Sequence, residues 1–418
     1  MEAPNEGLME QMLAPENLGA AWKAVKANHG APGIDGIGIE AFEEHMRPHW
    51  QTVRTKILEG RYQPAAVRRV YIPKSNGKER PLGIPTVLDR VLQQAMLQVL
   101  QPYFEPLFSV HSYGFRPGRS AHDAVKAAQH FIGLGKDWVV DMDLKSFFDE
   151  VDHDILMHRV AQVIRDKRML GLIGRCLRAG VYEGGVVSRT LRGVPQGSPL
   201  SPLLSNVYLD ALDKELESRG LSFCRYADDC NIYVGSQKAA ERVLASVVKW
   251  VEKHLKVPVN RDKSGQGRPW ERQFLGYQPT ETGELRPAPK SLERLKAEVH
   301  KRFEGRRSQT TKQMRDGWLQ YIRGWCNYFA LANERYWRRD ISPWIRRHVR
   351  KCFWQRWHSV KGRRRNLKRL GVGPRQLRRC PLHGAAWPMS KHPAMHKALN
   401  NATLKRYGFL TPSDFAVS

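Results

Sequence analysis

The stretch that decides the fold is Phe223-Cys-Arg-Tyr-Ala-Asp-Asp-Cys-Asn-Ile-Tyr233, in which two adjacent aspartates interrupt β-prone apolar residues. Aspartate is a poor strand former, so Asp228 and Asp229 fit best at the tip of a hairpin between two short strands over 223–234. The turn would free both carboxylates from strict alternation. A solvated Asp-Asp turn without chemistry is the alternative, and this stretch alone does not decide between the two.

A further strand is expected over 138–144, ahead of the hairpin in the chain. Side chains alternate along a strand, so Asp141 and Asp143 share one face. Carboxylates from a strand and a neighbouring hairpin are the pattern that nucleotidyl transfer needs, because it uses two divalent cations on the order of 4 Å apart. Mg²⁺ prefers a few carboxylate oxygens together with substrate phosphates and water.

The charge of the whole chain points to a polyanionic partner. Its 418 residues include 69 Lys and Arg against 41 Asp and Glu, a formal net charge of +28. Such a surface repels itself unless a polyanion covers it, which excludes a small acidic enzyme and favours nucleic acid; unspecific binding to membranes or polyanions is the alternative. Residues 291–379 alone hold 26 Lys and Arg, 6 Asp and Glu, and six of the twelve tryptophans. Binding and carboxylate chemistry are therefore predicted in different parts of the chain.

The hydrophobic pattern predicts an α+β arrangement up to about residue 290 and helices beyond it. Expected in the first part are a strand over 67–72 and helices over 89–100, 207–218 and 239–254. After the Pro-rich link at 286–290, apolar residues recur every three or four positions over 292–303 and 318–329. These read as amphipathic helices whose tryptophan face is core rather than a base-stacking surface. No apolar run is long enough to span a membrane, no signal peptide opens the chain, and its six cysteines are scattered, so a reduced, intracellular protein is expected.

Several short runs follow one another in a fixed order. They are Ala31-Pro-Gly-Ile-Asp-Gly36, Arg80-Pro-Leu-Gly-Ile-Pro85, Ser112-Tyr-Gly-Phe-Arg-Pro-Gly-Arg119, Asp143-Leu-Lys-Ser-Phe-Phe-Asp149, Val194-Pro-Gln-Gly-Ser-Pro-Leu-Ser-Pro202, Tyr226-Ala-Asp-Asp229, Phe274-Leu-Gly-Tyr277 and Gly324-Trp-Cys-Asn-Tyr-Phe329. This ordered set resembles reverse transcriptases, and more narrowly the reverse transcriptase and maturase encoded by bacterial group II introns, especially the compact class C type. The resemblance covers about residues 20–410.

The resemblance implies an α+β right-hand polymerase fold, with fingers and palm made of an antiparallel sheet plus helices. An α-helical thumb and a small basic C-terminal domain would follow. The domains it implies are an N-terminal extension that lids the template (1–60), fingers and palm (61–286), a maturase-type helical thumb (287–360) and a basic DNA-binding tail (361–418).

Carried over position by position, the resemblance makes Asp143, Asp228 and Asp229 the catalytic ligands of two Mg²⁺ ions, with Mn²⁺ as a possible substitute. Asp141 matches no ligand and is read either as structural or as a neighbour that supports the ligands without touching the metal. Nucleotide contacts are expected at Lys74 and Arg80, which flank a hairpin turn at Asn76-Gly77, and at Phe148, Gln196 and Lys263. Phe148 would act as the steric gate against a 2′-hydroxyl, and Lys263 as a general acid for pyrophosphate. An ordinary basic hairpin, a core phenylalanine and a surface lysine are the respective alternatives.

Nucleic-acid contacts are expected on basic residues of the fingers, the thumb and the tail. They are Arg116, Arg119, Arg346, Arg347, Arg350, Lys351, Arg363, Arg364 and Arg365. In the thumb cluster 346–351, Ile345, Val349 and Phe353 would form the packed side of the helix.

The function expected from this resemblance is RNA-directed DNA synthesis on intron RNA, together with binding of that RNA to assist splicing and mobility. Its partners would be the intron RNA template, a DNA primer or target DNA, and deoxynucleoside triphosphates, in the bacterial cytoplasm and without a membrane. Cys380 and His383 are too few to rebuild the endonuclease of larger intron proteins. Two alternatives remain open: a defence- or CRISPR-associated reverse transcriptase, and a catalytically idle RNA-binding splicing factor. The oligomeric state is left open.

Overall fold

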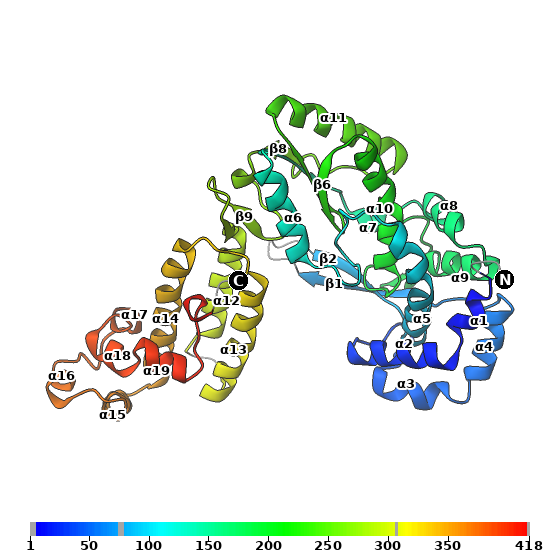
Figure 1. The fold of residues 1–418 in the computed structure, drawn as a ribbon. Helices are drawn as coiled ribbons and strands as arrows, with labels where there is room; N and C mark the ends of the chain where they lie inside the picture. Colours follow the sequence, from blue (N-terminus) through cyan, green and yellow to red (C-terminus); the bar gives the residue numbers. More distant parts are fainter. Residues whose placement is uncertain (1–5, 74–78, 306–307, 416–418) are drawn as a thin grey trace. The chain divides into compact units, whose positions relative to one another are not determined.

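The computed structural model describes residues 6–73, 79–305 and 308–415. The chain forms two compact units, residues 1–267 and 268–418, which are described separately (Figure 1). Within the described residues, no helix has the length and apolar character needed to cross a membrane.

The first unit begins with a helical layer. Its short helices are α1 (Leu8–Met12), α2 (Pro15–Ala27), α3 (Ile39–Met46) and α4 (Trp50–Leu58). Helices α1, α2 and α3 contact α5 (Val87–Phe104), which contains the helix predicted over 89–100. Helix α5 begins where Thr86 caps it, with its side chain accepting a hydrogen bond from the Asp89 backbone N–H. The short 3₁₀ turn η1 (Glu105–Leu107) follows α5.

The central sheet of this unit has the strand order β6-β7-β3-β8. Its strands are β3 (Trp138–Asp143), β6 (Ser222–Tyr226), β7 (Asp229–Val234) and β8 (Gly265–Gly267). The paired strands are antiparallel. Helices α6 (Ala121–Gly133), α10 (Ser201–Ser218) and α11 (Gln237–His254) pack on it. Residues 230–234 of β7 are all buried, so protein covers both faces of the sheet there. The predicted strands over 138–144 and 223–234 and the helices over 207–218 and 239–254 are confirmed.

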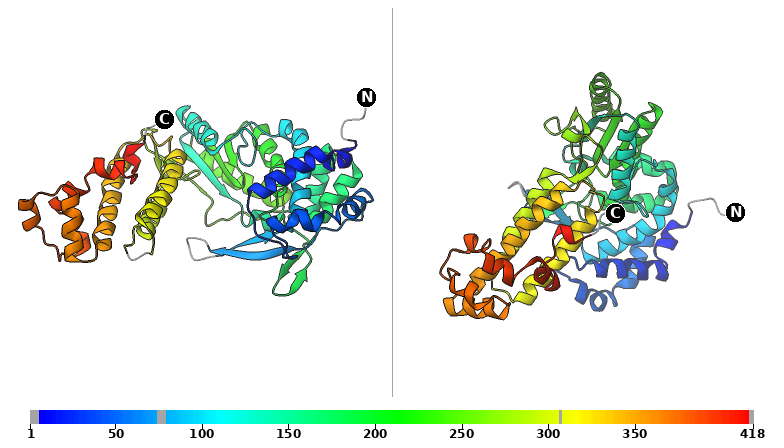
Figure 2. Two further views of the ribbon diagram at one scale, coloured as in Figure 1. Left: turned by 90° about the horizontal axis from the view of Figure 1, so that it is seen from below. Right: turned by 60° about the vertical axis from the view of Figure 1, so that its left-hand side comes forward.

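A second sheet has the order β2-β1-β4-β5. Strands β1 (Val67–Pro73) and β2 (Glu79–Ile84) pair antiparallel, whereas β1 and β4 (Val181–Glu183) pair parallel, and β5 (Val186–Ser188) closes a hairpin with β4. Both hairpins project from the helical part of the unit (Figure 2). Helices α7 (Phe147–Glu150), α8 (His153–Val163) and α9 (Lys167–Leu177) connect the two sheets along the chain.

The second unit is mainly helical. After η2 (Pro269–Glu271) and the hairpin β9 (Tyr277–Pro279) and β10 (Leu285–Pro287) come α12 (Pro289–Arg302), α13 (Thr311–Tyr328) and α14 (Tyr336–Arg356). Smaller elements follow: α15 (Val360–Arg369), α16 (Pro374–Arg378), α17 (Ala386–Met389), α18 (Pro393–Ala398), α19 (Asn401–Arg406) and η3 (Pro412–Asp414).

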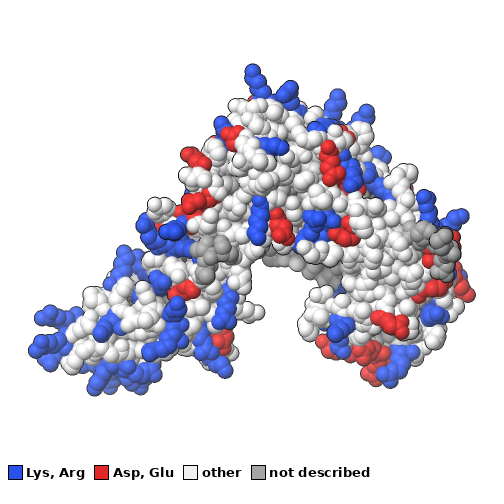
Figure 3. Space-filling model, viewed as in Figure 1, with Lys and Arg blue, Asp and Glu red and all other residues white. Residues whose placement is uncertain are grey.

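Three tryptophans, Trp318, Trp337 and Trp354, lie in the core of this second unit, so the predicted core role is confirmed for Trp318, whereas Trp325 on the same helix is half-buried. Trp318 and Trp354 are fully buried. Each indole N–H donates to a backbone carbonyl, Trp318 to Leu410 at 2.9 Å and Trp354 to Gly384 at 2.8 Å. The C-terminal segments are thereby tied to the long helices. Lys and Arg side chains gather over the part of this unit that α15 and α16 form (Figure 3).

Candidate active site

Three aspartates meet at one end of the central sheet. The register of β3 and β7 places Asp143 directly opposite Asp229. Tyr226 and Asp229 pair across β6 and β7, so Ala227 and Asp228 form a two-residue turn at the hairpin tip. Ala227 has a positive φ of 57°, which two-residue hairpin turns require at their first central position. The predicted hairpin tip is therefore present, and it brings its carboxylates to the strand that carries Asp143.

The carboxylates perturb one another. Partial desolvation of the Asp229 carboxylate by the surrounding protein raises its pKa, and the negative charges of Asp228, Asp141 and Asp143 raise it further, to about 7. Part of the Asp229 side chain remains exposed to solvent. Burial, and then the charge of Asp143, raises the pKa of Asp228 as well. The nearby cations Arg80 and Lys263 only partly compensate for the negative charge that these carboxylates bring together. Asp141 was not predicted to be a metal ligand, but its negative charge contributes to the raised pKa of Asp229.

Asp143 is held by the segment after α11. The Asn260 side-chain amide donates to Asp143 Oδ1 at 3.0 Å, and Lys263 Nζ lies 3.2 Å from Oδ2. The Asp143 backbone N–H donates to Ser264 Oγ at 3.0 Å. The sequence prediction placed Lys263 near the reacting phosphates but missed Asn260 and Ser264. Only their position within the run 260–264 could have suggested them.

The donor set at this end of the sheet suits Mg²⁺. No three His, Cys, Asp or Glu side chains in the described part of the chain enclose a metal position by themselves. Mg²⁺ does not need such a cage, because it retains water and takes substrate phosphates beside one or two carboxylates. An exposed Asp229, a half-buried Asp228 and a half-buried Asp143 offer that open, acidic arrangement.

Arg80 and Gln196 form a pair beside the carboxylates. Arg80, on β2, donates from Nε to Gln196 Oε1 at 2.8 Å. The turn that carries Gln196 approaches β2 closely, since the Gly83 N–H donates to the Gln196 carbonyl at 2.9 Å. Gly197 has a φ of +109°, and a Cβ there would lie 2.9 Å from the Gly83 carbonyl oxygen. Glycine is therefore required for this turn. Lys74 lies outside the described residues.

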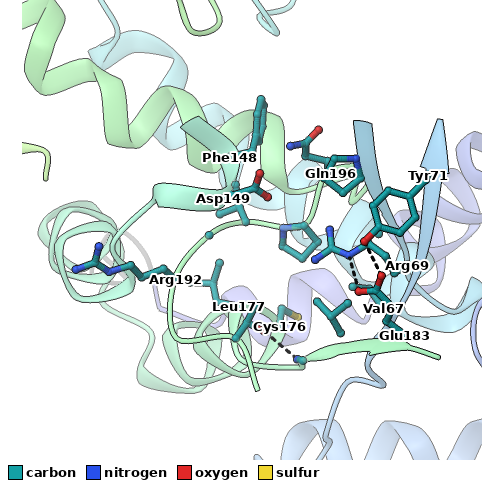
Figure 4. A pocket seen from close by; sticks show the side chains of 18 residues that line it. Val67, Arg69, Tyr71, Phe148, Asp149, Cys176, Leu177, Glu183, Arg192 and Gln196 are labelled. Carbon is teal, nitrogen blue, oxygen red and sulfur yellow. Dashed lines mark hydrogen bonds and ion pairs between the residues drawn. The ribbon is translucent and has the colours of Figure 1, made fainter. Parts of the chain in front are cut away.

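The two adjacent phenylalanines, Phe147 and Phe148, differ in their burial. Phe147 is buried in the core, whereas Phe148 is half-buried. Phe148 and Gln196 line a cavity of about 350 Å³, together with Arg69 and Tyr71 of β1 (Figure 4). Phe148 thus lies at the edge of this cavity.

A buried ion pair between Arg225 and Asp213 packs against the β6–β7 hairpin and holds its turn. Arg225 and Asp213 are both fully buried and joined by two hydrogen bonds of 2.7 and 2.6 Å. Arg225 also donates to the Ala227 carbonyl at 2.9 Å and to Ser112 Oγ at 2.7 Å. A Cβ on Gly114 would lie 2.3 Å from the Ala227 nitrogen, so the turn rests directly on a glycine backbone. Neither Arg225 nor Asp213 was predicted to have a role.

Two of the predicted nucleic-acid contacts need correction. Arg116 is buried, and it donates to Glu105 Oε1 at 2.8 Å and to the Ser112 carbonyl at 2.9 Å. Arg350 is also buried, and it donates to the Leu399 carbonyl at 2.9 Å and to Asn401 Oδ1 at 3.1 Å. Both guanidinium groups are satisfied inside the protein and are not presented to a phosphate backbone.

The other predicted contacts vary in exposure. Arg346 donates to Thr411 Oγ1 at 2.9 Å, and the Arg347 guanidinium stacks on Trp387 at 3.6 Å from the ring centroid. Arg363 donates to the Leu382 carbonyl, and Arg119 donates to the Val110 carbonyl. Lys351 is half-buried. Arg364 and Arg365 of α15 are exposed.

Comparison with known proteins adds independent findings. Residues 72–279 match the family described as reverse transcriptase (RNA-dependent DNA polymerase), and residues 292–371 match the maturase-specific domain of group II introns. Protein YkfC of Escherichia coli (strain K12) is 36% identical over 297 residues, which cover 62% of this chain and 78% of YkfC.

Two further likenesses cover smaller shares. The group II intron-encoded protein LtrA of Lactococcus lactis subsp. cremoris is 37% identical over 219 residues, 52% of this chain and 36% of LtrA. A chain of a partial Cas6-RT-Cas1–Cas2 complex is 26% identical with a TM-score of 0.38, covering 59% of this chain and 42% of that one.

Proposed function

The chain belongs to the family of group II intron-encoded reverse transcriptases with a maturase-specific domain, and on this premise we propose how it acts. It copies intron RNA into DNA at the carboxylate site of β3 and the β6–β7 hairpin. It also binds the intron RNA, through the helical second unit, to assist splicing and mobility. The match of residues 292–371 to the maturase-specific domain favours this role over a defence- or CRISPR-associated one.

Reverse transcriptases depend on divalent metal ions, and here Asp143, Asp228 and Asp229 would hold two Mg²⁺ or Mn²⁺ ions. When bound, such ions activate the attacking 3′-hydroxyl and stabilise the charge that develops on the phosphate. Asn260 and Ser264 keep the Asp143 carboxylate in place for this task.

The groups around the carboxylates bind and orient the nucleotide. Arg80 contacts the triphosphate, a role that the family resemblance also gives to Lys74, and Gln196 fixes the geometry of Arg80. The Phe148 ring blocks the space that a 2′-hydroxyl would occupy, which selects deoxynucleotides. Lys263 Nζ, beside Asp143, donates a proton to the departing pyrophosphate.

For the organisation of the whole chain, we keep the boundaries 1–60, 61–286, 287–360 and 361–418 as a proposal. The link at 286–290 falls between the two matched family regions, which end at 279 and begin at 292. The partners proposed are intron RNA, a DNA primer or target DNA, and deoxynucleoside triphosphates. The place of action proposed is the bacterial cytoplasm, on the nucleoid.

The observation that carries the proposal is the register that sets Asp143 opposite Asp229, with Asp228 at the adjoining turn. Its test is extension of a DNA primer annealed to an RNA template by the purified protein. Extension is expected with deoxynucleotides and Mg²⁺ and should stop when the metal is chelated. A protein that binds the RNA but never extends the primer would instead be the idle splicing factor.

A further inference from the structure

A groove of about 990 Å³ lies within the second unit, between its long helices and its C-terminal segment. Its walls come from α13, α14, α15 and the turn that follows α19. The volume is in the range of pockets that hold small ligands. None of the basic residues predicted to contact nucleic acid lines it.

The charge of this groove is strongly positive. Five basic residues line it against one acidic residue, Asp316; they are Lys312, Arg315, Arg356, Arg369 and Arg406. Arg315 pairs with Asp316 at 2.7 Å, and Arg356 donates to the Gln309 carbonyl at 2.6 Å. Lys312, Arg369 and Arg406 are exposed and have no acidic partner among the residues that the structure describes. Three cations at the rim are therefore available to an anionic ligand.

Aromatic rings lie among these cations. Tyr407 is 43% exposed, and the guanidinium of Arg406 lies 5.3 Å from its ring centroid. Phe353 and Trp357 are half-buried in the wall, and Phe353 packs edge-on against the buried Phe409 at 5.4 Å. Rings beside cations are what a nucleotide needs, because its base stacks while its phosphates pair with Lys or Arg.

The turn after α19 is fixed against α13. Gly408 has a φ of +81°, and a Cβ on it would lie 3.1 Å from the aliphatic stem of Arg315. A glycine at this position lets the chain pass close to α13. Tyr407 is consequently presented by a packed turn rather than by a free end.

We propose that this groove binds an unpaired nucleotide of folded RNA, a proposal that rests on the RNA-binding role given above. The base stacks on Tyr407, and the flanking phosphates contact Lys312, Arg369 and Arg406. Folded RNA supplies such nucleotides in bulges and loops, whereas duplex DNA does not. The Asp316 carboxylate at the rim can accept a hydrogen bond from a 2′-hydroxyl, which DNA lacks.

The test uses the full-length protein and a short RNA hairpin with one bulged 2-aminopurine nucleotide. The same hairpin without the bulge and a DNA copy of the bulged hairpin serve as comparison ligands. The wild-type protein should bind the bulged RNA roughly tenfold more tightly than the fully paired one and quench its fluorescence, since stacking on one ring gives an effect of this size.

Matched variants distinguish RNA binding in the groove from non-specific electrostatic attraction to the basic surface. Tyr407→Ala should lose both the preference and the quenching, and Tyr407→Phe should keep them. Tyr336→Ala is the control, because Tyr336 is also exposed beside an arginine, Arg339, but lies outside the groove. Arg369→Gln should weaken binding more than Lys368→Gln, its exposed neighbour on α15 that does not line the groove.

Equal binding of bulged and paired RNA by the wild-type protein would overturn the proposal, as would a Tyr407→Ala protein with unchanged preference. Equal binding of the bulged DNA would overturn its assignment to RNA. Primer extension by the same wild-type preparation is measured in parallel. If the protein extends primers but does not prefer the bulged RNA, only the proposed nucleotide binding by the groove is refuted. If it prefers the bulged RNA but does not extend primers, only the proposed polymerase activity is refuted.

Discussion

At the residue scale, neighbouring side chains of one type have different surroundings. Phe147 fills the core, and Phe148 borders the cavity beside Gln196. Asp143 and Asp141 share one face of β3, but only Asp143 is opposite Asp229. Sequence spacing could identify each pair, and the packing of the elements separates their members.

The gate assigned to Phe148 can be tested by changing its size. Phe148→Val should open space beside the sugar and raise incorporation of ribonucleotides relative to deoxynucleotides, measured by single-nucleotide extension. Phe147→Leu is the control: it removes buried apolar contacts, so it should lower thermal stability and leave sugar selectivity unchanged. Selectivity that shifts equally in both variants would place the gate elsewhere.

A buried histidine predicts how stability depends on pH. Burial, and then the positive charges of His300, Lys351 and Arg347, lowers the pKa of His348 to about 4. Between pH 6.5 and 4 the unfolded chain binds a proton here that the folded chain does not, so stability is lost as pH falls through this window.

His348→Leu should therefore lose less thermal stability than the wild-type protein between pH 7 and pH 5. The exposed His383 lies in the same unit, and His383→Asn should follow the wild-type curve. The measurement is the melting temperature of each variant against pH. Parallel curves for His348→Leu and wild type would show that His348 binds protons to the same extent in the folded and unfolded states, so its pKa is not lowered by folding.

At the element scale, the β6–β7 hairpin is held by the buried Arg225–Asp213 ion pair, through the hydrogen bond from Arg225 to the Ala227 carbonyl. The β6–β7 hairpin and strand β3 were predictable, because alternation and a pair of turn-forming aspartates are local signals. The Arg225–Asp213 pair was not, since nothing local distinguishes a buried arginine from a surface one. The same limit explains Arg116 and Arg350, which were predicted to contact nucleic acid. Arg116 donates to Glu105 and to the Ser112 carbonyl four residues away, and Arg350 donates to the distant Leu399 carbonyl.

Breaking the pair behind the hairpin should cost far more than breaking a surface pair. Arg225→Met leaves Asp213 charged and buried, so it should destabilise the first unit by about 3–5 kcal/mol. Arg261→Met removes an ion pair with Glu252 whose arginine side chain is 70% exposed, and should cost about 0–1 kcal/mol. Urea denaturation of the two variants measures the difference. Similar midpoints would mean that the buried pair does not support the hairpin.

At the scale of the whole molecule, the carboxylate cluster and the most basic region of the chain lie in different units. The carboxylate site belongs to residues 1–267, while residues 291–379 carry 26 Lys and Arg against 6 Asp and Glu. Composition alone predicted this separation. Which cations face outward could not be predicted, because that depends on how the small C-terminal helices pack on α13 and α14.

Salt dependence should report on the exposed cations. Each Lys or Arg that contacts a phosphate releases counterions, so its loss lowers the slope of log affinity against log salt by roughly 0.7–0.9. Replacing Arg364 and Arg365 with Gln should therefore flatten the slope for intron RNA. Asp228→Asn, in the other unit, should leave it unchanged. An unaltered slope in the double variant would make these two arginines a solvated surface without RNA contacts.

The most direct test of the central claim compares Asp228→Asn with Asp141→Asn in primer extension on an RNA template. Both changes keep size and remove one charge near the same site, but only Asp228 is assigned as a metal ligand. Extension should fall by several orders of magnitude for Asp228→Asn and stay close to wild type for Asp141→Asn, with RNA affinity unchanged in both. Near-normal extension by Asp228→Asn, or an equal loss in the two variants, would contradict the account.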